Sequence, residues 1–279
     1  LRGLDNWYHI SQHNLEFRFD GETIQTRPTP GHGQWGLTMD DLGRLYYTPN
    51  SNALLADAYP KHYAVRNPAQ GSASGIGELV APDSTTWPAR PTPGVNRGYQ
   101  PDVLRPDGTL ASLTAACGPT IYRAGLLGDG FRGNAFICES AGLLVKRLEV
   151  SDKNGVPAAV NAYQGTEFLR STDERFRPVN SLVGPDGGLY IIDMARGVIQ
   201  HRTYVTPYLR EQIKSRHLEK PLVLGRILRI VPESGTPRAR PHLGGASDSR
   251  LVELLSDPDG WWRDTAQRLL VERHAVGAG

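Results

Sequence analysis

Short apolar and aromatic runs, each preceded by turn residues, recur along the first 233 residues. The strings are LDNWYHI (4–10), DDLGRLYYT (40–48), FRGNAFICE (131–139) and GPDGGLYIID (184–193). Their aromatic positions Tyr8, Tyr46, Phe136 and Tyr190 follow one another at intervals of 38, 90 and 54 residues, and 90 is two steps of 45. A period of roughly 40–50 residues built from short strands is typical of propeller blades. We therefore predict a mainly β fold with five or so blades of a β-propeller in residues 1–233.

The polar residues that precede these runs have a structural explanation. In Asp-x-Gly before Leu-Tyr, the aspartate caps a tight turn and the glycine adopts a positive φ, so the motif predicts a hairpin within a blade. Residues 49–116 are less regular and predict long loops over the propeller face. Long loops on a rigid scaffold often carry functional residues.

Helical spacing appears after Pro207, where Leu209, Ile213 and Leu218 are the apolar positions of TYVTPYLREQIKSRHL (203–218). This pattern predicts a helix inserted before a closing strand in LGRILRIVPE (224–233). Residues 234–247, SGTPRARPHLGGAS, then read as a Pro/Gly/Ser linker.

Two short helices are predicted in residues 248–279. The first is capped by Ser247 or Asp248, and the second places Trp262, Ala266 and the pair Leu269-Leu270 on one face. Two helices of this length cannot bury their own apolar face. The pair therefore resembles the first unit of a helical repeat array, cut off at Gly279.

Composition narrows the class of protein further. The 279 residues carry a net charge of +2 without a long basic run, which gives no electrostatic footprint for nucleic acid. No stretch approaches the 18 consecutive apolar residues of a membrane span. The chain starts at Leu1 without a signal-peptide pattern, so we expect a processed or excised piece whose preceding residues supply the missing blade strands.

The two cysteines, Cys117 and Cys138, allow two interpretations. Both are flanked by strand-like residues, so they are either a pair of buried thiols or a disulfide across neighbouring strands. No Cys-x-x-Cys-His motif occurs, and no haem is expected on this chain.

His32 is the candidate for chemistry that the repeat does not explain. Among the four repeated strings, only DDLGRLYYT (40–48) has a histidine eleven residues before its turn glycine, Gly43. Imidazole titrates near working pH and suits a catalytic base. The alternative is a turn histidine at the central channel that bonds only to neighbouring backbone.

Several strings together resemble one protein family. They are HGQWGLTMDDLGRLYY, YPKHYAVRNP, GVNRGYQPD, CGPTIYR, STDERFRPVNSLVGPDGGLYIIDMARGVIQHR, LGRILRIVP and GWWRDTAQRLL. They are similar to the large bacterial membrane-bound dehydrogenase-like proteins common in planctomycetes and verrucomicrobia. The resemblance covers nearly the whole chain. It implies a glucose/sorbosone-dehydrogenase-type propeller (1–233), a linker (234–247), a truncated first HEAT-like repeat (248–279) and a c-type cytochrome domain elsewhere.

The resemblance also implies roles for residues. The better-understood relatives are six-bladed sugar dehydrogenases that hold pyrroloquinoline quinone and Ca²⁺ on the top face, with a histidine base before a blade turn. His32 matches that base, because Gly43 and Tyr46 follow it by 11 and 14 residues. Gln34 and Trp35 depart from the family's glycine pair.

The same resemblance implies which charged residues of this chain would bind the quinone and its Ca²⁺. Arg177 stands where the relatives place an arginine that contacts the quinone, although an inter-blade salt bridge would also explain it. Arg196 is a second cofactor candidate, and Asp193 is a weaker Ca²⁺ candidate. Further arginines are weaker candidates and several histidines are expected to be structural: Arg97, Arg123, His9, His62 and His201.

The expected function is oxidation of a sugar or related alcohol through a bound quinone. Electrons would pass to a c-type cytochrome domain or subunit outside this chain, and the HEAT-like repeats would contact other proteins. The expected location is the periplasm or cell surface, with any membrane association through regions outside the chain. The alternative is a non-catalytic binding or structural propeller in a larger envelope or extracellular assembly.

Overall fold

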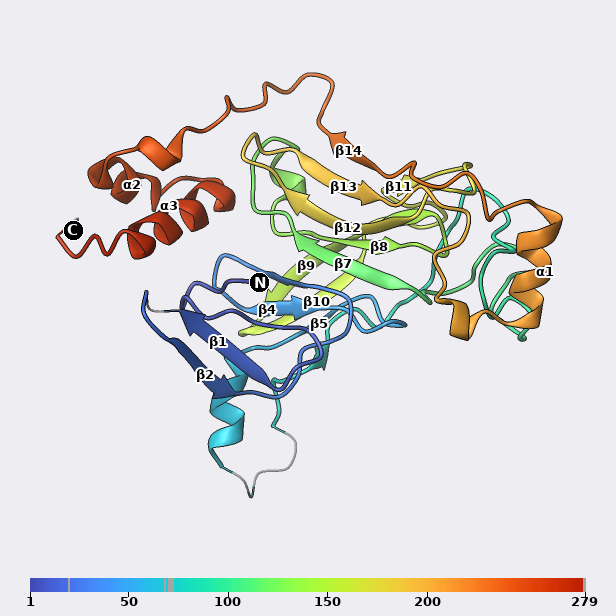
Figure 1. Ribbon diagram of the computed structural model, residues 1–279, viewed down its shortest axis with the longest axis horizontal. Helices are drawn as coiled ribbons and strands as arrows, with labels where there is room; N and C mark the ends of the chain where they lie inside the picture. The colour runs from blue at the N-terminus through green and yellow to red at the C-terminus, as the bar shows by residue number, and fades with distance from the viewer. Residues whose placement is uncertain (20, 68, 70–72, 278–279) are drawn as a thin grey trace.

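The structure is a computed structural model that describes residues 1–19, 21–67, 69 and 73–277. Its strands form antiparallel sheets, and its few helices lie mainly at the two ends of the molecule (Figure 1). The chain is thus mainly β, as predicted. Among the described residues, no helix combines the length and apolar character needed to cross a bilayer.

The named strands of the described residues fall into four sheets that follow one another along the chain. The first contains β1 (Leu15–Phe19) and β2 (Ile24–Pro28), and the second β3 (Leu37–Met39), β4 (Leu45–Tyr47), β5 (Leu55–Ala56) and β6 (Glu78–Leu79). The third contains β7 (Ala116–Ile121), β8 (Ala135–Glu139), β9 (Leu144–Lys153), β10 (Val156–Asn161) and β11 (Leu169–Arg170). The fourth contains β12 (Pro178–Val183), β13 (Leu189–Asp193) and β14 (Arg226–Ile230).

The first strands of the last three sheets pack against one another. β3 contacts β7, and β12 contacts both β7 and β8, while the strands within each sheet follow one another by antiparallel pairing. Sheets arranged in this way share an inner row of first strands, which is the arrangement expected of consecutive blades. The hydrophobic core lies between these sheets, in one cluster around Tyr46 and Ile137 and a second around Tyr122 and Phe136.

The repeated aromatic positions confirm the sequence pattern in part. Tyr46, Phe136 and Tyr190 each lie in the second strand of a sheet, in β4, β8 and β13. Tyr8 lies outside the named strands and makes an isolated bridge to Phe17.

The prediction of two blades in the 90-residue interval is wrong. Between β6 and β7 the chain forms no named strand and only two isolated bridges, Thr85 with Ser112 and Leu104 with Leu110. The proline- and glycine-rich sequence there favours turns, so the chain forms the long loops that were also expected for residues 49–116.

The short helices agree with the patterns that predicted them. α1 (Pro207–Ser215) begins at Thr206, whose side chain accepts a hydrogen bond from the Leu209 amide, and β14 follows as the closing strand. α2 (Asp248–Leu254) is capped by Ser247, and α3 (Gly260–Glu272) packs on it through Trp262 and Ala266. Short 3₁₀ turns complete the structure: η1 (Lys61–Arg66), η2 (Asp129–Phe131), η3 (Arg202–Tyr204) and η4 (Leu243–Gly245).

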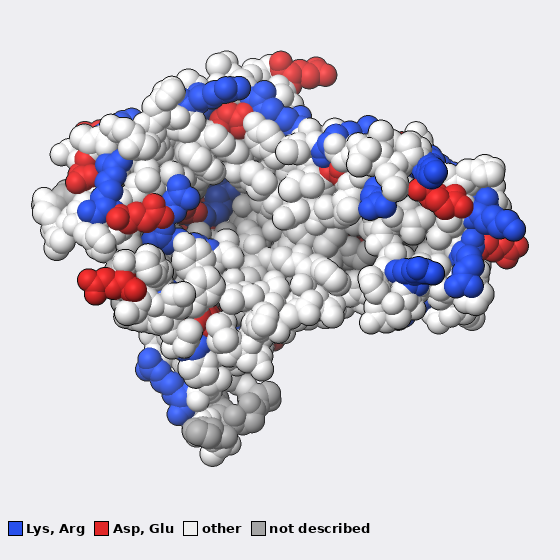
Figure 2. All heavy atoms as spheres, in the orientation of Figure 1, with Lys and Arg blue, Asp and Glu red and all other residues white. Residues whose placement is uncertain are grey.

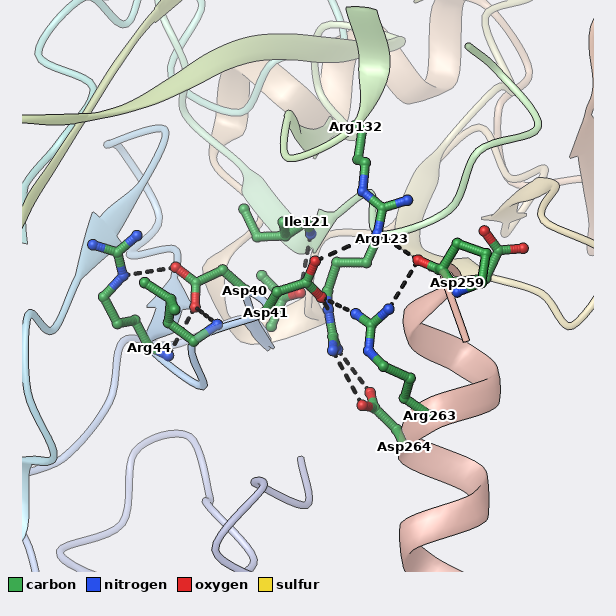
Figure 3. Close-up of polar contacts among 12 residues, drawn as sticks. Asp40, Asp41, Arg44, Ile121, Arg123, Arg132, Asp259, Arg263 and Asp264 are labelled. Carbon is green, nitrogen blue, oxygen red and sulfur yellow. Dashed lines mark hydrogen bonds and ion pairs between the residues drawn. The ribbon is translucent and has the colours of Figure 1, made fainter. Parts of the chain in front are cut away.

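Ion pairs attach the α2–α3 pair to the sheets at what we call the helix seam, formed by Asp41, Arg123, Arg132, Arg263 and Asp264 (Figure 3). Arg123 binds Asp264 with both terminal nitrogens, at 2.7 and 3.1 Å, and its Nε donates to Asp41 at 2.6 Å. Burial alone would raise the pKa of Asp41, but the bond from Arg123 and the nearby arginine charges hold it below its usual value. On the face in Figure 2, basic and acidic side chains alternate over this end of the molecule.

We expect Arg123→Leu to lower the free energy of unfolding by about 2 kcal/mol or more, because it removes the partner of Asp264 from a largely buried pair. Arg250→Leu is the matched control, since the Arg250–Glu253 pair is exposed and its loss should cost less than about 0.5 kcal/mol. Urea unfolding followed by tryptophan fluorescence measures both. Equal unfolding midpoints for the two variants would contradict the role of the seam.

Candidate functional site

His32 lies in the loop between β2 and β3, with its side chain fully buried. Its main chain bridges to Ser11, and the Gln12 amide donates to its carbonyl at 3.3 Å. The next residue, Gly33, has a φ of +45° and lies so close to Tyr47 that an added Cβ would come within 2.8 Å of that ring. The Gly-His-Gly sequence therefore lets the loop press the imidazole against β4.

The imidazole of His32 lies between two carboxylates. Its Nδ1 is 3.4 Å from Oδ2 of Asp57, and its Nε2 is 3.5 Å from Oε1 of Glu16. Neither ring nitrogen has a hydrogen-bond partner, and neither does Oδ2 of Asp57. A buried polar atom without a partner costs about 1–3 kcal/mol, so such a group commonly has a functional reason.

Asp57 is held from the side away from His32. Its Oδ1 accepts hydrogen bonds from the Tyr47 hydroxyl at 2.8 Å and the Gly77 amide at 2.9 Å. Lys61 lies 3.6 Å from Oδ2 and donates to the Gly31 carbonyl at 2.8 Å. Burial lowers the pKa of Lys61 and the charge of Asp57 acts against that shift. Asp57 thus presents one oxygen to His32 in a fixed position.

Glu16 is held by two cationic or imidazole groups besides His32. His9 Nδ1 donates to Oε1 at 2.8 Å, and Arg27 Nε donates to Oε2 at 2.6 Å. Burial alone would raise the pKa of Glu16, but His32, His9 and Arg27 hold it well below the usual range. Burial would also lower the pKa of His9, yet Asp5 and Glu16 raise it. We call His9, Glu16, His32, Asp57 and Lys61 the His32 cluster.

The His32 cluster takes the place of a hydrophobic core for the N-terminal segment. Among the described residues, no hydrophobic side chain before Met39 is fully buried. Instead Glu16 is buried while its strand neighbours Leu15 and Phe19 are 39% and 58% exposed. The first sheet is therefore attached to the rest of the molecule largely by charges and hydrogen bonds.

The cluster also contains a set of possible metal ligands. His9, Glu16 and His32 each offer one donor atom, and these three atoms lie within 4.8 Å of one another. Sequence reasoning classed His9 as structural and missed Glu16 and Asp57. The only signal was the charged Glu16 inside the apolar string LEFRF, where alternation would normally place it outward.

Arg177 forms a separate network. Its side chain is buried, and its three guanidinium nitrogens donate to the main-chain carbonyls of Ser140, Arg196 and Gly197 at 2.8–3.1 Å. Burial lowers its pKa to about 10. These bonds give Arg177 a role in joining loops, and no residue of the His32 cluster is among its partners.

Asp193 is an acceptor at the end of β13. Its Oδ1 accepts from the amides of Arg177 and Ala195, and its Oδ2 accepts from Arg226 Nε at 2.8 Å. A carboxylate whose two oxygens serve amides and an arginine does not fit a Ca²⁺ ligand.

The other candidates have different surroundings. Arg196 keeps a buried Nε without a hydrogen-bond partner, whereas Arg97 is exposed. Arg123 belongs to the helix seam. The His62 ring lies 4.2 Å from that of Tyr63 in a tilted arrangement, and His201 is exposed beside Tyr204 (ring centroids 5.7 Å apart).

Cys117 and Cys138 lie opposite each other on β7 and β8, so their predicted placement on neighbouring strands is confirmed. Both are free thiols, and no disulfide joins them in this structure. The Cys117 sulfur turns toward the Ser140 hydroxyl and the Pro178 carbonyl of the next sheet. Burial raises the pKa of Cys117 to about 12 and that of Cys138 well above its usual value, which disfavours the thiolate form at both positions.

A cavity of about 170 Å³ lies where the N-terminal residues meet α3. Its lining includes Arg2, Leu4, Met39, Trp261 and Gln267. None of the residues predicted to act in chemistry lines it, so it belongs to the helix seam and not to the His32 cluster.

These features define a mainly β chain of successive antiparallel sheets with a buried imidazole–carboxylate cluster. The chain belongs to the family described as a domain of unknown function, DUF7133, whose model matches residues 3–234. No curated protein matches it in sequence.

Solved structures give distant similarities. One is a protein assigned as an oxidoreductase (glucose dehydrogenase) from Thermus thermophilus, with 16% identity and a TM-score of 0.31 over 77% of this chain and 73% of that one. Another, a glucose dehydrogenase, has 15% identity and a TM-score of 0.32 over 64% and 69%. Structures this different give no basis for assigning an activity.

The two arginine candidates should differ in how much their removal lowers the free energy of unfolding. Arg177→Ala should lower the free energy of unfolding by roughly 3 kcal/mol or more, because three buried carbonyls lose their donor. Arg196→Ala should change it by less than about 1 kcal/mol, since its buried Nε has no partner to lose. Urea unfolding measures both changes. An Arg177→Ala protein with the wild-type free energy of unfolding would contradict the structural role of Arg177 and leave its guanidinium free to bind a ligand.

Proposed function

We propose that this chain is a β-propeller domain of a dehydrogenase-like protein that oxidises a sugar or related alcohol, with His32 as the proton acceptor. The observation that carries the proposal is the His32 imidazole, buried between Asp57 and Glu16 with both nitrogens unpartnered. The adjacent first strands of successive sheets support the propeller. We propose the six-bladed type as the form of this propeller.

The two carboxylates suit His32 to accept a proton. Oxidation of an alcohol to a carbonyl releases the hydroxyl proton, and one ring nitrogen takes it while the other faces a carboxylate. Asp57, fixed by Tyr47 and Gly77, then stabilises the imidazolium charge through Nδ1. Glu16 lies on the Nε2 side.

Access to His32 requires movement of the segment that covers it. The imidazole has no solvent exposure. Glu16 of the first sheet lies on its Nε2 side, and the ring of His9, which precedes that sheet, packs edge-on against it. That segment contributes no fully buried hydrophobic side chain among the described residues. Its displacement therefore costs polar contacts and little hydrophobic burial, which suits a cover over a substrate site.

The electron acceptor in this proposal is a quinone of the pyrroloquinoline quinone kind, which when bound would accept the carbon-bound hydrogen of the alcohol together with two electrons, as a hydride. Of the predicted pair, Arg196 has a buried donor to offer, whereas Arg177 is committed to main-chain carbonyls. Asp193 does not fit the Ca²⁺ that accompanies this cofactor in the relatives. A c-type cytochrome partner, HEAT-like contacts through α2–α3 and a periplasmic or surface location belong to the same proposal.

The alternative is a non-catalytic binding or structural propeller. The sealed environment of His32 and the structural bonding of Arg177 favour it. The two functions differ in whether any turnover depends on His32.

The test is reconstitution with pyrroloquinoline quinone and Ca²⁺, followed by a dye-reduction screen over sugars and related alcohols. His32→Ala should lower the rate on the best substrate by at least about 10²-fold, as for loss of a general base. His201→Ala, which removes an exposed histidine, should leave it unchanged.

Equal rates for wild type and His32→Ala would remove His32 from the mechanism. No turnover in the wild type with any substrate would leave the binding or structural function.

A further inference from the structure

We propose that His9, Glu16 and His32 form a binding site for one divalent transition metal ion of the Zn²⁺ kind. The ion would occupy the His32 nitrogen that the substrate proton needs, and so would inhibit the oxidation. The binding site stands on the geometry alone, whereas the inhibition rests on the proposed function.

The three donor atoms are placed closely enough to share one ion. Glu16 Oε1 lies 3.5 Å from His32 Nε2 and 2.8 Å from His9 Nδ1, and all three donors fall within 4.8 Å. Ligands bonded at 2.0–2.1 Å to a tetrahedral ion are about 3.3–3.4 Å apart. Shifts of a fraction of an ångström would therefore bring the donors to metal distance.

The donor set selects the class of ion. Two imidazoles and one carboxylate suit Zn²⁺ and similar transition metals, whereas Ca²⁺ and Mg²⁺ prefer oxygen ligands. Burial of all three side chains, each 7% exposed or less, also resembles a site enclosed by protein.

Groups behind the ligands hold two of them in the required orientation. Asp57 Oδ2 lies 3.4 Å from Nδ1 of His32, so with an ion at Nε2 this carboxylate would be the partner of the other ring nitrogen. Arg27 binds Glu16 Oε2 and leaves Oε1 on the side of the histidines.

The remaining ligand, His9, has Asp5 at 3.6 Å from its Nε2. A carboxylate behind a ligating histidine is the usual second partner in protein metal sites. The nearby positive charges are those of Arg27 and Lys61, and both already contact carboxylates of this region.

Unsatisfied groups provide independent support. Both His32 nitrogens are buried without partners, although the ring lies beside two carboxylates. An ion at Nε2 would satisfy that nitrogen and balance the Glu16 charge. Binding would release the proton between His9 and Glu16, and any proton on Nε2 of His32, because the metal ion takes their place.

The first experiment measures binding without reference to activity. The full chain, stripped with chelator, is titrated with Zn²⁺ in a calorimeter, and with Co²⁺ while its visible absorption is recorded. We expect one ion per chain and the intense spectrum of a four-coordinate Co²⁺ site. Ca²⁺ should give no binding.

Variants assign the ligands. His32→Ala should weaken Zn²⁺ binding at least about 100-fold, and Asp57→Asn about 10–100-fold as the partner of a ligand. Asp57→Asn keeps the side-chain shape and remains informative if His32→Ala fails to fold. His62→Ala is the matched control, because His62 is close enough for the Glu16 charge to act on it but lies outside the set of donors. No binding by the wild type, or equal affinity in Asp57→Asn and wild type, would overturn the site.

Inhibition is tested separately in the dye-reduction assay. Zn²⁺ should lower the wild-type rate at the concentration that half-saturates the calorimetric site. Bound Zn²⁺ without loss of rate would overturn the inhibition and leave the site. Absence of any turnover would count against the proposed function, and the calorimetry would still decide the metal site.

Discussion

The N-terminal part of this structure depends on the hydrogen bonds and ion pairs of one buried carboxylate, that of Glu16. It binds His9 and Arg27 directly and lies beside the unpartnered Nε2 of His32. No hydrophobic side chain before Met39 is fully buried among the described residues, so these charged contacts, and not a hydrophobic core, attach the N-terminal segment to the rest of the molecule. The cost of burying a carboxylate is offset only if its partners stay in place, so the first sheet and the loop that carries His32 are coupled.

A second set of charges attaches the C-terminal helices at the helix seam. Arg123, which comes shortly after β7, pairs with Asp264 of α3, and both Arg123 and Arg263 pair with Asp41 of the β3–β4 turn (Figure 3). The Trp262 indole adds a hydrogen bond to the Pro185 carbonyl before β13. Polar contacts thus join the ends of the chain to a hydrophobic centre of three sheets. The first sheet, at the His32 cluster, and the α2–α3 pair, at the helix seam, are therefore the segments whose attachment depends on charge.

The sequence predicted the local elements better than their assembly. Period-two strands around Tyr46, Phe136 and Tyr190, and helices after Thr206 and Ser247, follow from apolar spacing and caps, which are local properties. The interval between Tyr46 and Phe136 has the length of two repeats, but long loops between β6 and β7 occupy it where a further blade was expected. At the site, His32 could be found from its departure from the repeat. Its partners could not, because they come from segments whose approach depends on the whole fold.

The burial pattern of β1 is the reverse of the one that its sequence predicts, which shows why alternation alone fails at this site. Alternation would bury Leu15 and Phe17 and expose Glu16, yet Glu16 is inside. Glu16 is buried in place of its apolar neighbours because His9 and Arg27 pair with its carboxylate, and the spacing of apolar residues along the chain does not show this pairing. Charge pairing between distant residues is the information that the sequence pattern lacks.

The most direct test of the account follows the two ring nitrogens of His32 in long-range ¹H–¹⁵N spectra of the full chain, before and after addition of Zn²⁺. The account predicts that Zn²⁺ shifts the resonance of Nε2, on the side of Glu16, and leaves that of Nδ1, beside Asp57, nearly unchanged. A shift of the Nδ1 resonance alone, or of neither nitrogen, would contradict the metal ligand assigned to His32.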